Sequence, residues 1–211
     1  MATGDPVPVR VLEVFADVWC PFTHVGLRRI VEQRARLGRD DVIVRVRAWP
    51  LELVNGEPLG ADLVAEEIQA LRQAVAPDLF VGFNLERFPS TSLPALMLAA
   101  AAYRRDDRTG EQVSLALRTA LFEDGADLAD PAELASIADA VEMEPPGAEA
   151  EQAIRDDWEE GRGRGVVGSP HFFVNQHGFF CPALAIQRVN GHLRITSDSD
   201  GFAAFVDTVF A

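Results

Sequence analysis

A cysteine followed by proline stands near the N-terminus, in the stretch DVWCPFTHVGLRR at residues 17–29. Cys20 follows a predicted strand, and Pro21 falls at the first position of a predicted helix, where its missing N–H costs nothing. Unpaired N–H groups at a helix N-terminus favour a thiolate over a thiol, so Cys20 is a candidate nucleophile. The alternative is a small buried side chain without reactivity.

Thr23 occupies the position at which a C-x-x-C redox motif has its second thiol. In a two-thiol enzyme this second cysteine attacks the mixed disulfide and releases the substrate, which a threonine hydroxyl cannot do. An internal C-x-x-C redox cycle is therefore excluded.

The elements around Cys20 are predicted from the pattern of apolar residues. Residues 9–15, VRVLEVF, and residues 42–48, VIVRVRA, are rich in β-branched side chains and predict two strands. Between them a helix is predicted with Leu27 and Leu37 on its apolar side, and it ends at Gly38. Strand, helix and strand of this length predict a parallel pair with a right-handed crossover.

The rest of the chain predicts a helical block followed by a hairpin. Helical periodicity extends over residues 61–160, with Asp130 as the cap of one helix. HFFVN and FFCPAL then predict an antiparallel hairpin that turns at residues 176–178, and GFAAFVDTVF predicts a closing helix. We therefore expect an α/β fold in three parts: residues 1–60, a helical insertion at 61–160, and residues 161–211.

Two motifs in this order resemble those of the DsbA family of thioredoxin-fold proteins. ADVWCPFTHVGLRRI resembles the D-x-x-C-P-x-C active-site segment, and GVVGSPHFFVN resembles the glycine-rich approach to the cis-proline loop. VRVRAWPLELVNG is similar to a segment of the cytoplasmic branch that includes 2-hydroxychromene-2-carboxylate isomerases and kappa-class glutathione transferases. The resemblance implies a thioredoxin-like fold with an all-helical insertion between the second strand and the cis-proline loop.

The resemblance also implies roles for individual residues. Cys20 matches the attacking cysteine, and Pro21 and Phe22 match the pair that follows it. Pro170 matches the cis-proline, and Ser169 before it would present backbone groups to a substrate.

Other polar residues near these motifs are weaker candidates. His171 flanks the cis-proline loop and is a candidate for proton transfer, whereas His24 is expected to be an exposed helix residue. Asp17 is a candidate for capping or orienting the active-site loop, and Arg162 and Arg164 are expected in a solvated loop. The cysteines and histidines lack a metal-ligand spacing, so no metal is expected.

Cys181 is the second cysteine of the chain. With a turn near residues 175–178, it lies opposite Phe172, and in the thioredoxin strand order the cis-proline strand separates it from the first strand by about 10 Å. A disulfide needs Cα atoms within about 7 Å. We therefore expect Cys181 to be buried or to line the pocket rather than to pair with Cys20.

The resemblance leaves three functions open. In the first, which we expect, the protein is a DsbA-like thiol–disulfide oxidoreductase. Cys20 forms a mixed disulfide that an external small thiol resolves, with glutathione or mycothiol as co-substrate and no tightly bound cofactor. In the second, Thr23 stabilises the Cys20 thiolate in a thiol-cofactor-dependent isomerase or transferase. In the third, the chain is a non-catalytic binding protein.

Net charge and hydropathy limit the classes of partner that the protein can bind. The net charge of −14 and a pI near 4.6 repel a phosphate backbone, which argues against nucleic acid. The N-terminus lacks a basic region followed by an apolar run, and no segment approaches about 18 consecutive apolar residues. A cytoplasmic protein without a membrane partner is therefore expected. The resemblance implies a small thiol or disulfide as the substrate, and homodimerisation stays open.

Overall fold

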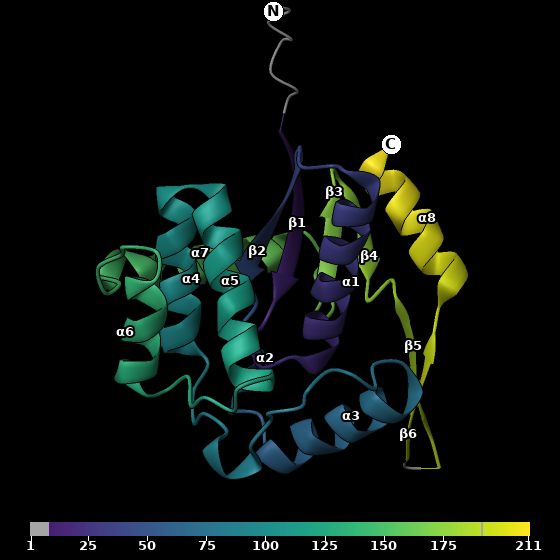
Figure 1. Cartoon of the computed structure of the whole chain (residues 1–211), viewed down its shortest axis with the longest axis horizontal. Coiled ribbons are helices and arrows are strands. Elements are labelled where there is room, and N and C mark those ends of the chain that lie inside the picture. The colour runs from purple at the N-terminus through teal and green to yellow at the C-terminus, as the bar shows by residue number, and fades with distance from the viewer. Residues whose placement is uncertain (1–8, 191) are drawn as a thin grey trace, which may run out of the picture.

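A four-stranded mixed sheet forms the centre of the computed structural model, which describes residues 9–190 and 192–211 (Figure 1). The strands lie in the order β2-β1-β3-β4, with β1 and β2 parallel and the other neighbours antiparallel. Their bounds are β1 (Arg10–Ala16), β2 (Val42–Ala48), β3 (His171–Val174) and β4 (His177–Phe180). The predicted parallel pair and the mixed sheet are confirmed.

Helices occupy the long segment between β2 and β3, which contributes no strand over its described length, residues 49–170. Helix α1 (Pro21–Leu37) precedes β2. The segment itself contains α2 (Leu51–Asn55), α3 (Ala61–Ala74), the short 3-10 helix η1 (Leu85–Arg87), α4 (Leu93–Arg105), α5 (Asp107–Phe122), α6 (Pro131–Asp139) and α7 (Ala148–Gly163). The predicted helical insertion is confirmed, while the division of the chain at residues 60 and 160 stays a prediction. Within the two described ranges, no helix is long and apolar enough to cross a bilayer.

Alternation along β1 separates two apolar clusters. Leu12 and Val14 join the cluster that also contains residues of α1 and of α8 (Ser199–Phe210), so these two helices cover one face. Phe15 points the other way and packs edge-on against Trp49 and Phe173. The strand that leads to Cys20 is thereby fixed from both sides.

Helix α1 begins and ends where the sequence predicts. Pro21 is its first residue, and Gly38 adopts a left-handed conformation with φ +63° while its N–H donates to the Ala35 carbonyl. Leu37 was expected on the buried side, but it is 46% exposed. The last turn of α1 extends past the core, so the apolar pattern overestimates the buried length.

The hairpin after Pro170 turns earlier than predicted. Asn175 and Gln176 join β3 to β4, so residues 177–178 belong to the strand rather than to the turn. Asn175 adopts φ +57°, a left-handed conformation that asparagine tolerates better than most residues. Phe172 therefore pairs with Phe179, and the prediction that Cys181 lies opposite Phe172 is wrong.

A second, two-stranded sheet is missing from the sequence-based prediction. It consists of β5 (Leu184–Val189) and β6 (His192–Ser197). β6 packs against α3. Most side chains of β5 are exposed or half-buried, so the sheet leaves only a weak apolar pattern in the sequence.

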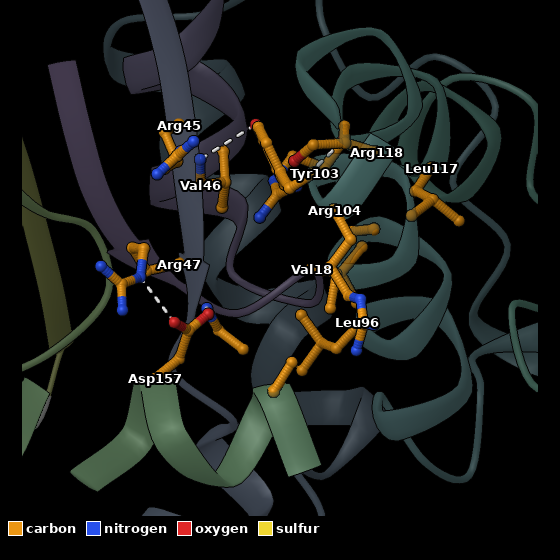
Figure 2. A pocket seen from close by; sticks show the side chains of 15 residues that line it. Val18, Arg45, Val46, Arg47, Leu96, Tyr103, Arg104, Leu117, Arg118 and Asp157 are labelled. Atoms are coloured by element: carbon orange, nitrogen blue, oxygen red, sulfur yellow. Dashed lines mark hydrogen bonds and ion pairs between the residues drawn. The ribbon is translucent and has the colours of Figure 1, made fainter. Parts of the chain in front are cut away.

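The outer edge of β2 is covered by side chains of the helical segment. Polar atoms from three helices accept hydrogen bonds from its backbone N–H groups, and the bond to Tyr103 can be followed in Figure 2. The pairs are Val44 with Glu111 Oε2 at 2.7 Å, Val46 with Tyr103 Oη at 2.9 Å, and Ala48 with Asp157 Oδ2 at 2.9 Å. An otherwise unpaired strand edge is thus satisfied within the chain.

Candidate active site

Cys20 occupies the N-cap position of α1, in the turn that joins β1 to this helix. Its residue surface is only 3% exposed. Pro21, Phe22 and Thr23 form the first turn of α1 and are buried as well. The position agrees with the prediction, and the burial restricts access to the sulfur atom.

Ser169 and Pro170 lie opposite Cys20, and the peptide bond between them is cis, as the resemblance implies. The Cys20 thiol donates to the Ser169 carbonyl oxygen at 3.1 Å. The Ser169 hydroxyl lies 2.9 Å from Thr23 Oγ1 and accepts a hydrogen bond from the Asp17 N–H at 3.0 Å. The structure therefore brings the two sequence motifs together in one polar site.

The pKa of the Cys20 thiol is raised above its usual value. Burial is the largest cause, because a thiolate loses hydration there. Hydrogen bonds from the side chains of Ser169 and Thr23 favour the thiolate but do not outweigh burial. Burial therefore opposes the expected preference for a thiolate at the helix N-terminus.

Glu67 on α3 is an acidic neighbour of Cys20 that the sequence patterns do not identify. Its negative charge raises the pKa of the thiol further. Burial also raises the pKa of Glu67 itself to about 7, with Arg188 opposing this shift. Because α3 is distant from residue 20 in sequence, only its packing beside α1 brings this charge near the thiol.

Asp17 orients the active-site loop, as predicted. Its carboxylate accepts hydrogen bonds from the N–H groups of Trp19 at 3.0 Å and Leu51 at 2.6 Å. The carboxyl group is completely buried, which raises its pKa to about 6 even though both N–H donors favour the charged form.

Cys181 lies beside the cis-proline segment. Its N–H donates to the Pro170 carbonyl at 3.0 Å, and its backbone adopts φ +43°. The Cys181 thiol is free, as is that of Cys20, and both side chains belong to the same buried cluster. Burial raises the pKa of Cys181 to about 12, and the nearby Cys20 adds to this rise. The expectation of a buried cysteine is confirmed.

The two histidines differ from the prediction in their surroundings. His24 is 2% exposed rather than solvated; its ring lies 2.7 Å from Glu123 and packs against both Phe80 and Phe122. Burial lowers its pKa to about 4. His171 stacks on Phe173, on the sheet face away from α1, and burial lowers its pKa as well. Neither histidine ring contacts Cys20 in the part of the chain that the structure describes.

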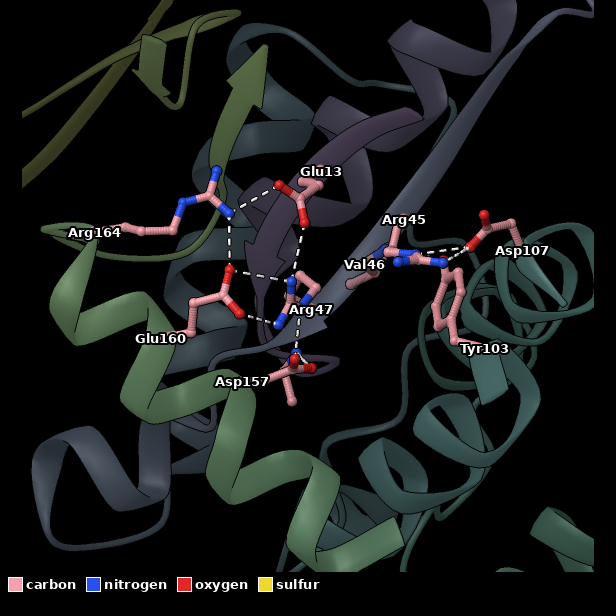
Figure 3. Close-up of polar contacts among 10 residues, drawn as sticks. Glu13, Arg45, Val46, Arg47, Tyr103, Asp107, Asp157, Glu160 and Arg164 are labelled. Carbon is pink, nitrogen blue, oxygen red and sulfur yellow. Dashed lines mark hydrogen bonds and ion pairs between the residues drawn. The ribbon is translucent and has the colours of Figure 1, made fainter. Parts of the chain in front are cut away.

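Arg164 is part of an ion-pair network rather than of a solvated loop. It pairs with Glu13 at 2.8 Å and with Glu160 at 3.2 Å (Figure 3). Arg47 joins the same two carboxylates, and the Arg164 guanidinium also lies over the Phe173 ring. The network anchors the glycine-rich loop before Ser169, and the Arg164 guanidinium is held by these ion pairs.

No cluster of three or more histidine, cysteine or acidic side chains suited to a metal ion occurs in the two ranges that the structure describes.

Comparison with known proteins agrees with this geometry. A family model for the DSBA-like thioredoxin domain matches residues 11–194. No curated protein shows significant similarity to the chain.

Solved structures share the fold at low sequence identity. The cytosolic disulfide reductase DsbM from Pseudomonas aeruginosa is 14% identical, with a TM-score of 0.64 over 95% of this chain and 98% of that chain. The same reductase with GSH gives a TM-score of 0.64 at 15% identity, with the same coverage. A 2-hydroxychromene-2-carboxylate isomerase is 14% identical, with a TM-score of 0.62 over 81% of this chain and 88% of that chain.

Proposed function

Because the chain belongs to the family of DSBA-like thioredoxin domains, we propose that it catalyses thiol–disulfide exchange through Cys20, with a small external thiol as the second reactant. The observation that carries the proposal is the contact of the Cys20 thiol with the Ser169 carbonyl, beside a threonine instead of a second cysteine. The nucleophile and the segment that would align a substrate are present, and the resolving thiol of a C-x-x-C motif is not.

The reaction proceeds in two exchanges. The Cys20 thiolate attacks one sulfur of a small disulfide, so that a mixed disulfide forms, the original S–S bond breaks and one thiolate leaves. That thiolate takes up the proton that Cys20 released. A second small thiol then attacks the substrate sulfur of the mixed disulfide, which forms a new small disulfide and returns Cys20 as a thiol. The net reaction exchanges one thiol partner of a disulfide for another.

Burial of the thiol favours small substrates over protein disulfides. Only 3% of the Cys20 surface is exposed, so an extended protein segment cannot reach the sulfur without displacement of the covering residues. Glutathione and mycothiol are compact thiols of suitable chemistry, and a cytoplasmic location, where such thiols are reduced, forms part of the proposal. The related fold of a cytosolic reductase with GSH supports this choice.

A thiol-cofactor-dependent isomerase or transferase is the second candidate. The raised pKa of Cys20 favours it, because a protonated thiol can donate a hydrogen bond to the sulfur of a bound cofactor. In that case Cys20 binds the cofactor without forming a covalent bond.

Mass spectrometry of the intact protein distinguishes these reactions. We expect oxidised glutathione to add one glutathionyl group to the wild type and to Cys181→Ala, but none to Cys20→Ser. Reduced glutathione should remove the group. An adduct that persists in Cys20→Ser and disappears in Cys181→Ala contradicts the proposal. Calorimetric binding of glutathione without an adduct supports the second candidate.

A further inference from the structure

A cavity of about 250 Å³ lies between β2 and the helices α4, α5 and α7 (Figure 2). Its apolar wall includes Val18, Leu96 and Leu117. Val18 stands two residues before Cys20, but Cys20 itself does not line the cavity. The cavity is therefore a separate space behind the active-site loop.

Arg118 on α5 places a buried positive charge in the wall of this cavity. The residue is 1% exposed. Its Nη1 donates to the carbonyl and the hydroxyl of Ser114 at 2.9 and 2.7 Å, and its Nη2 donates to the Asp17 carbonyl at 3.1 Å. All these acceptors are uncharged, and the buried Nε has no hydrogen-bond partner. A buried guanidinium that has only neutral acceptors is suited to an anion.

The other charges around the cavity are largely matched. Arg45 pairs with Asp107 at 2.5 Å, and Arg47 pairs with Asp157 at 2.5 Å (Figure 3). Arg104 on α4 is exposed, and no ion pair within the described ranges includes Arg104 or Arg118. The cavity wall therefore carries two unpaired guanidinium groups.

Neither of the two acidic side chains near Arg118 forms an ion pair with it. The Asp17 charge interacts with Arg118, but its carboxylate receives hydrogen bonds from the N–H groups of Trp19 and Leu51. Asp157 is the acidic residue of the cavity wall, and it is held by Arg47 and by the Ala48 N–H. The Arg118 guanidinium therefore forms an ion pair with neither of these carboxylates.

We propose that this cavity binds a small organic carboxylate with an apolar body. The carboxylate lies against Arg118, Arg104 stands at the exposed side, and the body of the ligand packs on Leu96 and Leu117. A single-ring acid suits a cavity of this volume. The proposal goes beyond the thiol chemistry of Cys20 and does not depend on it.

Titration calorimetry with benzoate tests the proposal, with benzyl alcohol as the uncharged probe of similar shape. We expect saturable binding of benzoate, and we expect the affinity for benzyl alcohol to be lower by about tenfold or more. Arg118→Met should abolish the preference for benzoate. Because Arg118 is buried and its replacement can disturb folding, Ala100→Leu provides a second variant that fills the cavity and keeps the charge.

Ala135→Leu is the matched control, since Ala135 is exposed on α6 and does not line the cavity. Loss of benzoate binding in Ala100→Leu with retention in Ala135→Leu supports the site. Equal binding of the two probes, equal binding of benzoate to wild type and Ala100→Leu, or no binding of benzoate by the wild type overturns the proposal.

Discussion

The Cys20 site and the cavity behind it are separated by one loop, yet their polar groups differ in how they are paired within the protein. At Cys20, the thiol and the hydroxyls of Ser169 and Thr23 are hydrogen-bonded within the protein. In the cavity wall, Arg118 donates only to neutral acceptors and forms no ion pair among the described residues. Internal contacts therefore control the reactivity of the first region, whereas the second region has unused capacity for a ligand.

Asp17 connects the two regions through its backbone. Its N–H donates to the Ser169 hydroxyl, and its carbonyl accepts from Arg118. The buried carboxylate of the same residue holds the loop between them. Substitutions at Asp17 and around Cys20 can therefore test how independent the regions are.

The largest effect is expected for the pH dependence of stability at Asp17. Its pKa rises from 3.8 to about 6 on folding, so its contribution is present below about pH 4 and is lost as the pH rises to about 6. This shift corresponds to about 3 kcal/mol. In urea unfolding from pH 4 to 6.5, which covers most of this titration, the difference in unfolding free energy between Asp17→Asn and wild type should move by about 2 kcal/mol in favour of the variant.

Taking the difference between the two proteins removes the contribution of His24, which has the opposite sign. Because burial lowers the pKa of His24 to about 4, its contribution is lost as the pH falls from about 6.5 to 4 in both proteins. Parallel stability profiles of wild type and Asp17→Asn would show that the Asp17 carboxyl is not responsible for the expected change.

A smaller effect is expected for Thr23→Val, which removes a hydroxyl at nearly constant volume. The variant loses the contact with Ser169 and the hydrogen bond that favours the Cys20 thiolate. The pKa of Cys20 should rise, and alkylation by iodoacetamide at pH 8 should slow by about fivefold, equivalent to about 1 kcal/mol. Thr23→Ser, which keeps the hydroxyl, is the control. An unchanged rate in Thr23→Val would refute this role of the hydroxyl.

The smallest effect is expected for Glu67→Gln. Loss of the negative charge should lower the pKa of Cys20 and accelerate its alkylation at pH 8 by about twofold. Glu66→Gln is the matched control, because Glu66 is exposed on the same helix. The interpretation fails if both variants change the rate equally or if Glu67→Gln slows the reaction.

Local sequence patterns predicted the frame of the active site well. Pro21 and Gly38 set the ends of α1 because backbone geometry at a helix terminus depends on a few adjacent residues. Asp130 caps α6 for the same reason, with its side chain accepting from the Ala132 N–H. The two motifs around Cys20 and Pro170 predicted the family and the contact between distant segments.

Long-range packing decided the electrostatics of both regions. The sequence by itself determined the fold class, the position of Cys20 at a helix N-terminus and the absence of a C-x-x-C partner at Thr23. Only the tertiary structure decided that Cys20 is buried next to Glu67 and that Arg118 faces a cavity. The reason is that desolvation and charge interactions depend on which distant helices cover a residue, and no local pattern encodes that arrangement.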